Sequence, residues 1–174
     1  MERSAKLNIR EDDAMKGNVI LDLIIVVAII AMIGIVSTIG IMVLDDFSAG
    51  VQDLENFNDT HVENTKTSII TFNEGSVFIF FGLVAAAIVS SYLLRQHPVY
   101  AIFSIILLYI SAYIVATISN FFQDFTTDPQ TVAAANNFPL LLTLMENIVP
   151  ITFGAGIIII IAMFAKTGGG EQQI

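Results

Sequence analysis

The chain has 174 residues, of which 55% are hydrophobic and 13% are charged, and its formal net charge is −9 at pH 7. Soluble domains carry about 25% charged residues, so this composition indicates a membrane protein. The acidic balance argues against nucleic acid as a direct partner, because phosphate binding needs clustered Lys and Arg. The absence of cysteine excludes disulfides, thiolate metal sites and cysteine nucleophiles.

The first apolar segment, residues 18–44, follows a polar N-terminal segment, 1–17, that carries four basic residues. About 20 helical residues cross the hydrocarbon core of a bilayer, so 18–44 predicts a transmembrane helix. Asp22 is the one acid in this span, and an ionisable residue in a span is by default a functional candidate. Because Asp22 lies only about one helical turn after Gly17, we expect it at headgroup level or in a contact between subunits.

Residues 45–75 are polar and acidic, and they predict an outer loop. As the largest polar segment, this loop is the surface that we expect to meet a protein partner. His61 and Glu63 have a spacing that could bind a metal weakly. No second histidine and no cysteine lies nearby, which favours a solvated loop without metal.

A second transmembrane helix is predicted over 76–94 and a third over 99–122, joined by a tight inner turn at 95–98. A polar outer loop, 123–137, follows the third span. The fourth span is predicted over 138–165.

The fourth span is interrupted by polar residues and by proline. Pro150 removes a backbone donor, so we expect a kink at this residue, with a tilted or surface-lying part before it. Glu146 precedes the proline and is the second carboxylate within an apolar span. We expect it at the outer interface or in a contact between subunits rather than in a transport path. A flexible polar tail is predicted over 166–174 by its composition.

Small residues recur in three of the spans and allow close approach of helix backbones. They are Ala31 and Gly34 in the first span, Gly82, Ala86 and Ser90 in the second, and Gly154 and Gly156 in the fourth. This pattern predicts tight helix–helix packing. The sequence does not separate contacts within one chain from contacts in a homo- or hetero-oligomer.

Basic residues near the ends of the spans predict the orientation of the chain. Four lie in the N-terminal segment, one is Arg95 in the inner turn, and one is Lys166 in the tail, whereas the two opposite loops contain only Lys66. We therefore expect an all-α, multi-pass integral membrane protein with four transmembrane helices. Both termini would lie on the inner side, cytoplasmic or particle-interior, and both acidic loops would face outward.

No catalytic constellation, cofactor motif or metal-ligand cluster is found in the sequence, so we expect no enzyme activity and no cofactor. Three classes of function stay open. The first is a structural membrane protein within a larger assembly. The second is a channel or a membrane-permeabilising, holin-like protein, and the third is an accessory subunit of a membrane enzyme complex.

The hairpin of residues 93–122, the acidic outer loops and the short polar N-terminus resemble small multi-pass membrane proteins of viruses with an internal membrane, of the tectivirus and corticovirus type. The resemblance implies a structural virion protein that links an internal lipid membrane to a capsid. Its partners would be the lipid bilayer and other membrane or capsid proteins of the assembly.

Overall fold

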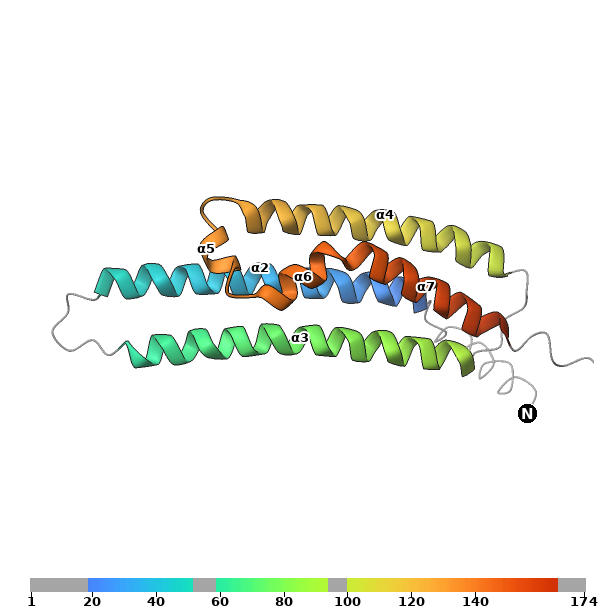
Figure 1. The fold of residues 1–174 in the computed structure, drawn as a ribbon, viewed down its shortest axis with the longest axis horizontal. Helices are drawn as coiled ribbons and strands as arrows, with labels where there is room; N and C mark the ends of the chain where they lie inside the picture. Colours follow the sequence, from blue (N-terminus) through green and yellow to red (C-terminus); the bar gives the residue numbers. More distant parts are fainter. Residues whose placement is uncertain (1–18, 52–58, 94–99, 166–174) are drawn as a thin grey trace, which may run out of the picture.

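The computed structural model describes residues 19–51, 59–93 and 100–165, and these residues form helices without any strand. In chain order the helices are α2 (Val19–Val51), α3 (Thr60–Leu93), α4 (Tyr100–Thr127), α5 (Val132–Ala135), α6 (Pro139–Glu146) and α7 (Ile148–Ala165). Figure 1 shows α2, α3 and α4 lying lengthwise in one bundle, and α7 returning to the end of the bundle where α2 begins. The described ends, Val19 and Ala165, therefore lie towards the same end.

The helices are long and apolar enough to cross a membrane. α2, α3 and α4 each pass this test alone, and α6 with α7 passes it as one broken span bent by 63°. The chain is therefore an all-α, multi-pass membrane protein, with three spans in the residues that the structure describes, or four when the broken pair counts as one. The expected fold class is confirmed.

Large apolar side chains fill the centre of the bundle. The fully buried ones come from α2, α3, α4, α6, α7 and the segment before α6, and include Val27, Phe80, Val115, Phe122, Phe138, Leu141, Ile148 and Ile159. All of these except Ile159 pack into one continuous cluster. Around it, α2 contacts α3 and α4, and α7 also contacts α3 and α4. Close packing between helices is what holds membrane helices together, because lipid tails are as apolar as the core.

The segment 45–75 is not a loop over most of its length. α2 continues to Val51 and α3 begins at Thr60, so only 52–58 falls outside the described residues. No proline interrupts either helical part, and threonine and serine hydroxyls donate to carbonyls four residues earlier, as Thr67 does to Glu63. Asp45, Asp46, Glu63 and Glu74 therefore lie on helices that extend the spans.

The segment 123–137 also differs from the expected loop. α4 continues to Thr127, and the short helix α5 follows. The side chain of Asn137 donates to the carbonyls of Ala133 and Ala134 at 3.3 and 3.0 Å, which satisfies two acceptors at the end of α5. The Thr131 hydroxyl bonds to the carbonyl of Phe125 and ties this turn to α4.

The fourth span breaks at Asn147 and not at Pro150. α6 ends at Glu146 and α7 starts at Ile148, so Pro150 lies in the first turn of α7, where its missing N–H costs no helical hydrogen bond. A proline ring clashes with the carbonyl four residues earlier, which here belongs to Glu146. The proline therefore ends the preceding helix and begins the next one.

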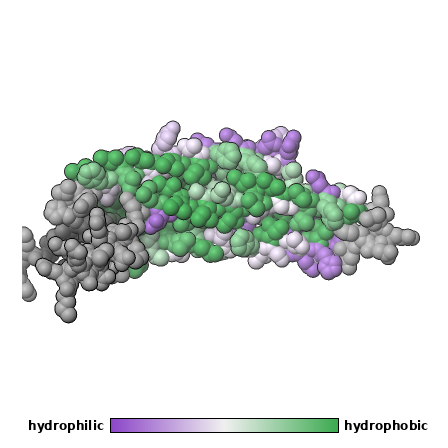
Figure 2. All heavy atoms as spheres, turned by 180° about the vertical axis from the view of Figure 1, so that it is seen from behind, coloured by the Kyte–Doolittle hydropathy of each residue, from purple (hydrophilic) through white to green (hydrophobic). Residues whose placement is uncertain are grey.

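The polar surface gathers away from the termini. Figure 2 shows hydrophobic residues over most of one face, with hydrophilic residues along one edge and towards the end opposite the termini. The predictions for the N-terminal segment 1–17, the inner turn 95–98 and the tail 166–174 fall outside the described residues.

Candidate functional site

Two helices project beyond the rest of the bundle. In Figure 1, α2 and α3 extend past α4, α5 and α6 at the end opposite the termini. We call residues 45–51 of α2 and 59–66 of α3 the two-helix extension. These are the described residues on either side of 52–58.

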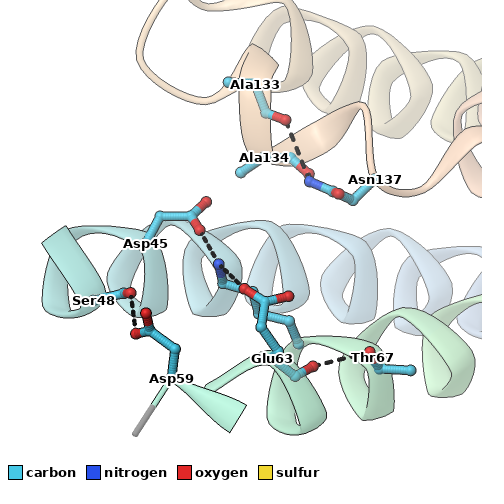
Figure 3. Close-up of polar contacts among 9 residues, drawn as sticks. Asp45, Ser48, Asp59, Glu63, Thr67, Ala133, Ala134 and Asn137 are labelled. Carbon is cyan, nitrogen blue, oxygen red and sulfur yellow. Dashed lines mark hydrogen bonds and ion pairs between the residues drawn. The ribbon is translucent and has the colours of Figure 1, made fainter. Parts of the chain in front are cut away.

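Polar side chains join the two helices of the extension, as Figure 3 shows. The Lys66 ammonium lies 2.5 Å from a carboxylate oxygen of Asp45 on the facing helix and 3.1 Å from Glu63 on its own helix. Ser48 donates to Asp59 across the same pair at 3.1 Å. Hydrogen bonds to Asp45 and then to Glu63 raise the pKa of Lys66 above its ordinary value of 10.5. The ammonium is therefore charged at neutral pH, and these contacts fix how the two helices lie relative to each other.

The extension keeps an acidic balance after this pairing. Its described residues hold four acids, Asp45, Asp46, Asp59 and Glu63, against the single lysine, Lys66. His61 is exposed, and within the described ranges no three His, Asp or Glu side chains gather closely enough to hold a metal ion. The chemistry that this surface offers is attraction of a basic partner.

Three further acids lie at one height along the bundle, which we call the acidic level. They are Glu74 on α3, Asp124 on α4 and Glu146 at the end of α6. Asp124 and Glu146 are exposed and Glu74 is half-buried. Charged side chains avoid hydrocarbon, so we infer that the acidic level lies at one boundary of the lipid core.

Contacts between helices establish this common height. A β-carbon on Gly34 of α2 would lie 2.6 Å from the Phe122 ring and 2.5 Å from Leu141, which places α4 and α6 beside this glycine. The Ser119 hydroxyl donates to the Met145 carbonyl at 2.7 Å, so Glu146 lies beside the same part of α4.

The position of Glu74 follows from the antiparallel packing of α2 on α3. A β-carbon on Gly40 of α2 would lie 3.7 Å from the Ile69 side chain of α3. Glu74 lies five residues farther along α3, so in this antiparallel pair it is level with α2 near Ile35. On this inference the lipid core extends from the acidic level towards Val19 and Ala165, and α7, with 18 residues and a length of about 27 Å, is long enough to cross it.

Asp22 lies beside the apolar part of α3. It lines a groove of about 250 Å³ with α3 residues between Leu83 and Ser90, in the middle of the apolar part of α3. Its side chain is exposed in the single chain. The expectation of a headgroup position stays a prediction, since the described residues begin only three positions before Asp22. A contact between subunits stays a prediction.

The small residues divide into two groups. Gly34, Ala31 and Gly156 lie in close helix packing: Ala31 is buried, and a β-carbon on Gly156 would collide with Leu108 of α4. A second group has no such close contact: Gly82, Ala86 and Ser90 are exposed, and a β-carbon on Gly82 or Gly154 would meet nothing within 4 Å. The stripe on the second span therefore stays a prediction for contacts outside the single chain.

Two buried polar side chains were not singled out from the sequence. Asn73 of α3 is fully buried, and neither its amide nitrogen nor its amide oxygen has a hydrogen-bond partner. The hydroxyl of Thr152 in α7 is buried in the same way. In sequence Asn73 looks like one more polar residue of an acidic loop, and only the packing of α3 places it inside.

Comparison with protein-family models, curated proteins and solved structures found no match for the chain.

Proposed function

We propose that the chain is a structural membrane protein of a larger assembly, and that the two-helix extension is the surface that holds a partner protein to the bilayer. One observation carries the proposal. The extension is a helical, acidic element that projects past the acidic level, and Lys66 joins its two helices by an ion pair.

A helical projection suits a structural role. Binding a partner through ordered helices costs less conformational entropy than binding through a loop that must be ordered first. The excess of acids over lysine favours a partner with a basic surface and speeds its association at low ionic strength. Because the contact is electrostatic, high salt should weaken it.

The packed centre of the bundle supports a structural role over conduction through a single chain. Phe80, Phe122 and Ile159 are fully buried among neighbouring helices. A conduction path needs polar groups along a continuous line, and these side chains occupy the centre instead. Ion flux from the purified chain in liposomes is the assay that tests the channel alternative.

A more specific proposal names the kind of assembly and the orientation of the chain in the membrane. The resemblance to small membrane proteins of viruses with an internal membrane suggests that the partner is a capsid protein. The distribution of basic residues suggests that the extension points outward from the membrane and that the termini lie on the inner side. We further propose that the chain has no catalytic activity of its own.

Neutralising the extension tests the proposed function. The variant Asp46→Asn with Asp59→Asn removes two negative charges and retains side chains of nearly the same size. We expect it to insert normally into the native membrane or particle but to lose its co-purifying partner. Partner recovery should fall steeply as salt is raised in the unaltered protein.

A matched control places the same change elsewhere on the chain. Asp124→Asn lies on α4 outside the extension, is exposed, and should leave partner recovery unchanged. The proposal fails if the extension variant captures its partner as well as the control does, or if both lose it equally.

A further inference from the structure

The outward face of α2 carries a regular pattern. Exposed residues recur alternately three and four positions apart: Asp22, Ile25, Ile29, Met32, Val36, Ile39 and Val43. We call this set the α2 seam. Positions a and d of the seven-residue coiled-coil repeat have this spacing, and their side chains pack knobs into holes between parallel helices. Ile29, Val36 and Val43 fall at position a, where β-branched residues are favoured.

The outer half of the α2 seam consists of exposed apolar side chains beyond the acidic level. Val36, Ile39 and Val43 are 69%, 44% and 57% exposed, and they lie beyond Gly34, where the other helices carry the acidic level. If the lipid core ends at the acidic level, as inferred above, these apolar side chains face water. A face of this kind marks a site of contact with protein.

The inner half of the α2 seam carries an exposed carboxyl group beside apolar residues of α3. Asp22 is exposed and lines a groove beside the apolar part of α3. Carboxyl groups within a membrane span almost always face protein or a water-filled cavity, because lipid tails offer no hydrogen bond. Both halves of the seam therefore need a protein helix as cover.

A groove beside the seam offers room for the side chains of such a helix. It has a volume of about 350 Å³ and is lined by Ile29, Met32, Ile33, Val36, Ser37 and Phe72. Three of these residues belong to the seam itself. A helix lying along α2 would place its own projecting side chains in this groove.

We propose that the α2 seam packs against the α2 seam of a second copy of the chain, parallel and in register. Copies inserted in the same orientation present the same seam at the same height, so each apolar knob meets its counterpart. The two Asp22 carboxyls then lie opposite each other and can share one proton in a hydrogen bond. Asp46, at the next d position, is exposed, so the apolar seam ends at Val43.

The size of the contact is sufficient for a specific dimer. From Asp22 to Val43 the strip is roughly 33 Å long, and with the flank of α3 it is roughly 15 Å wide. Each copy then buries roughly 500 Å², so the pair reaches the roughly 1,000 Å² expected of a biological interface. The dimer is independent of the proposed partner, since it uses α2 and not the charges of the extension.

Disulfide cross-linking of the purified full chain in phosphatidylcholine vesicles, at high lipid excess, tests the dimer without any other protein present. The chain has no cysteine, so Met32→Cys and Val36→Cys each introduce one thiol. Both should give a disulfide-linked dimer on oxidation. The control Tyr113→Cys lies on α4 and is 76% exposed, and it should stay monomeric.

Substitution of Asp22 separates the carboxyl contact from the apolar packing. In the Met32→Cys chain, Asp22→Asn retains a hydrogen-bonding pair and should cross-link as before. Asp22→Leu removes the pair and should weaken dimerisation about three- to thirtyfold, measured by energy transfer on lipid dilution. Equal dimerisation of the Asn and Leu variants would overturn the role of Asp22.

The dimer itself has two contrary outcomes. Cross-linking of Tyr113→Cys as fast as of the seam variants would mean that contact is unspecific. Monomeric seam variants with unchanged circular dichroism, including a third variant at Val43→Cys, would show that lipid covers the seam.

Discussion

The Ser119 hydroxyl of α4 donates to the main-chain carbonyl of Met145, 26 residues later, at a distance of 2.7 Å. The bond reaches the last turn of α6, where carbonyls lose their helical partners because the chain bends. It joins the broken span to the unbroken helix beside it. Removing it should therefore loosen the bend without affecting the helices themselves.

Ser119→Ala should destabilise the protein by about 1 kcal/mol, because one buried hydrogen bond between α4 and α6 is lost. Reversible unfolding in mixed micelles of rising dodecyl sulfate content would measure the change. Ser111→Ala is the matched control, since the Ser111 hydroxyl bonds only to Leu107 of its own helix. A larger loss for the control than for Ser119→Ala would contradict the role of this bond.

Gly34→Ala tests the closest approach of α2 to its neighbours. The added β-carbon would lie 2.5 Å from Leu141 and 2.6 Å from Phe122, both of which are fully buried and cannot easily move. Overpacking costs about 1–3 kcal/mol and the helix gains about 1 kcal/mol from alanine, so we expect a net loss of about 1 kcal/mol in the same unfolding measurement.

Gly75→Ala is the control for that substitution. A β-carbon on Gly75 would meet nothing within 4 Å, so α3 should gain about 1 kcal/mol of helix stability. Equal effects at the two glycines would show that Gly34 is not held by close packing.

Lys66→Met should loosen the two-helix extension while leaving the spans intact. The ammonium is 18% exposed and its partner Asp45 51% exposed, so water screens the pair and its loss should cost no more than about 1 kcal/mol. Hydrogen exchange should quicken in the first turns of α3 and stay unchanged between Val77 and Ser90. Lys66→Arg should restore slow exchange, and equally fast exchange in both variants would contradict the ion-pair explanation.

Asn73→Leu should stabilise the protein. The amide of Asn73 is buried without a hydrogen-bond partner, and replacing it with an apolar side chain of similar size removes a desolvation cost of about 1–3 kcal/mol. Asn64→Leu, on an exposed face of the same helix, should change the free energy of unfolding by less than about 0.5 kcal/mol. A loss of stability in Asn73→Leu would show that bound water or another molecule satisfies this amide.

The sequence predicted the spans well, because an apolar run long enough to cross a bilayer has few alternatives. α2 and α4 begin within one residue of the predicted starts, 18 and 99, and α7 occupies the second part of 138–165. Close helix packing was predicted at Gly34 and Gly156, and in the structure a β-carbon on either glycine would collide with a side chain of a neighbouring helix. The ends of helices were harder, since acidic and hydroxyl residues continue a helix as readily as they form a loop.

By itself, the sequence determined that this protein is helical and lies in a membrane, since composition and the length of apolar runs leave no other solvent for these segments. Tertiary structure alone decided the relative heights of the helices. Packing placed Asp22 beside the middle of α3 and brought Glu74, Asp124 and Glu146 to one level, although they are far apart in the chain. The height of a residue along the bundle depends on contacts between helices, and the order of residues in one sequence does not specify these contacts.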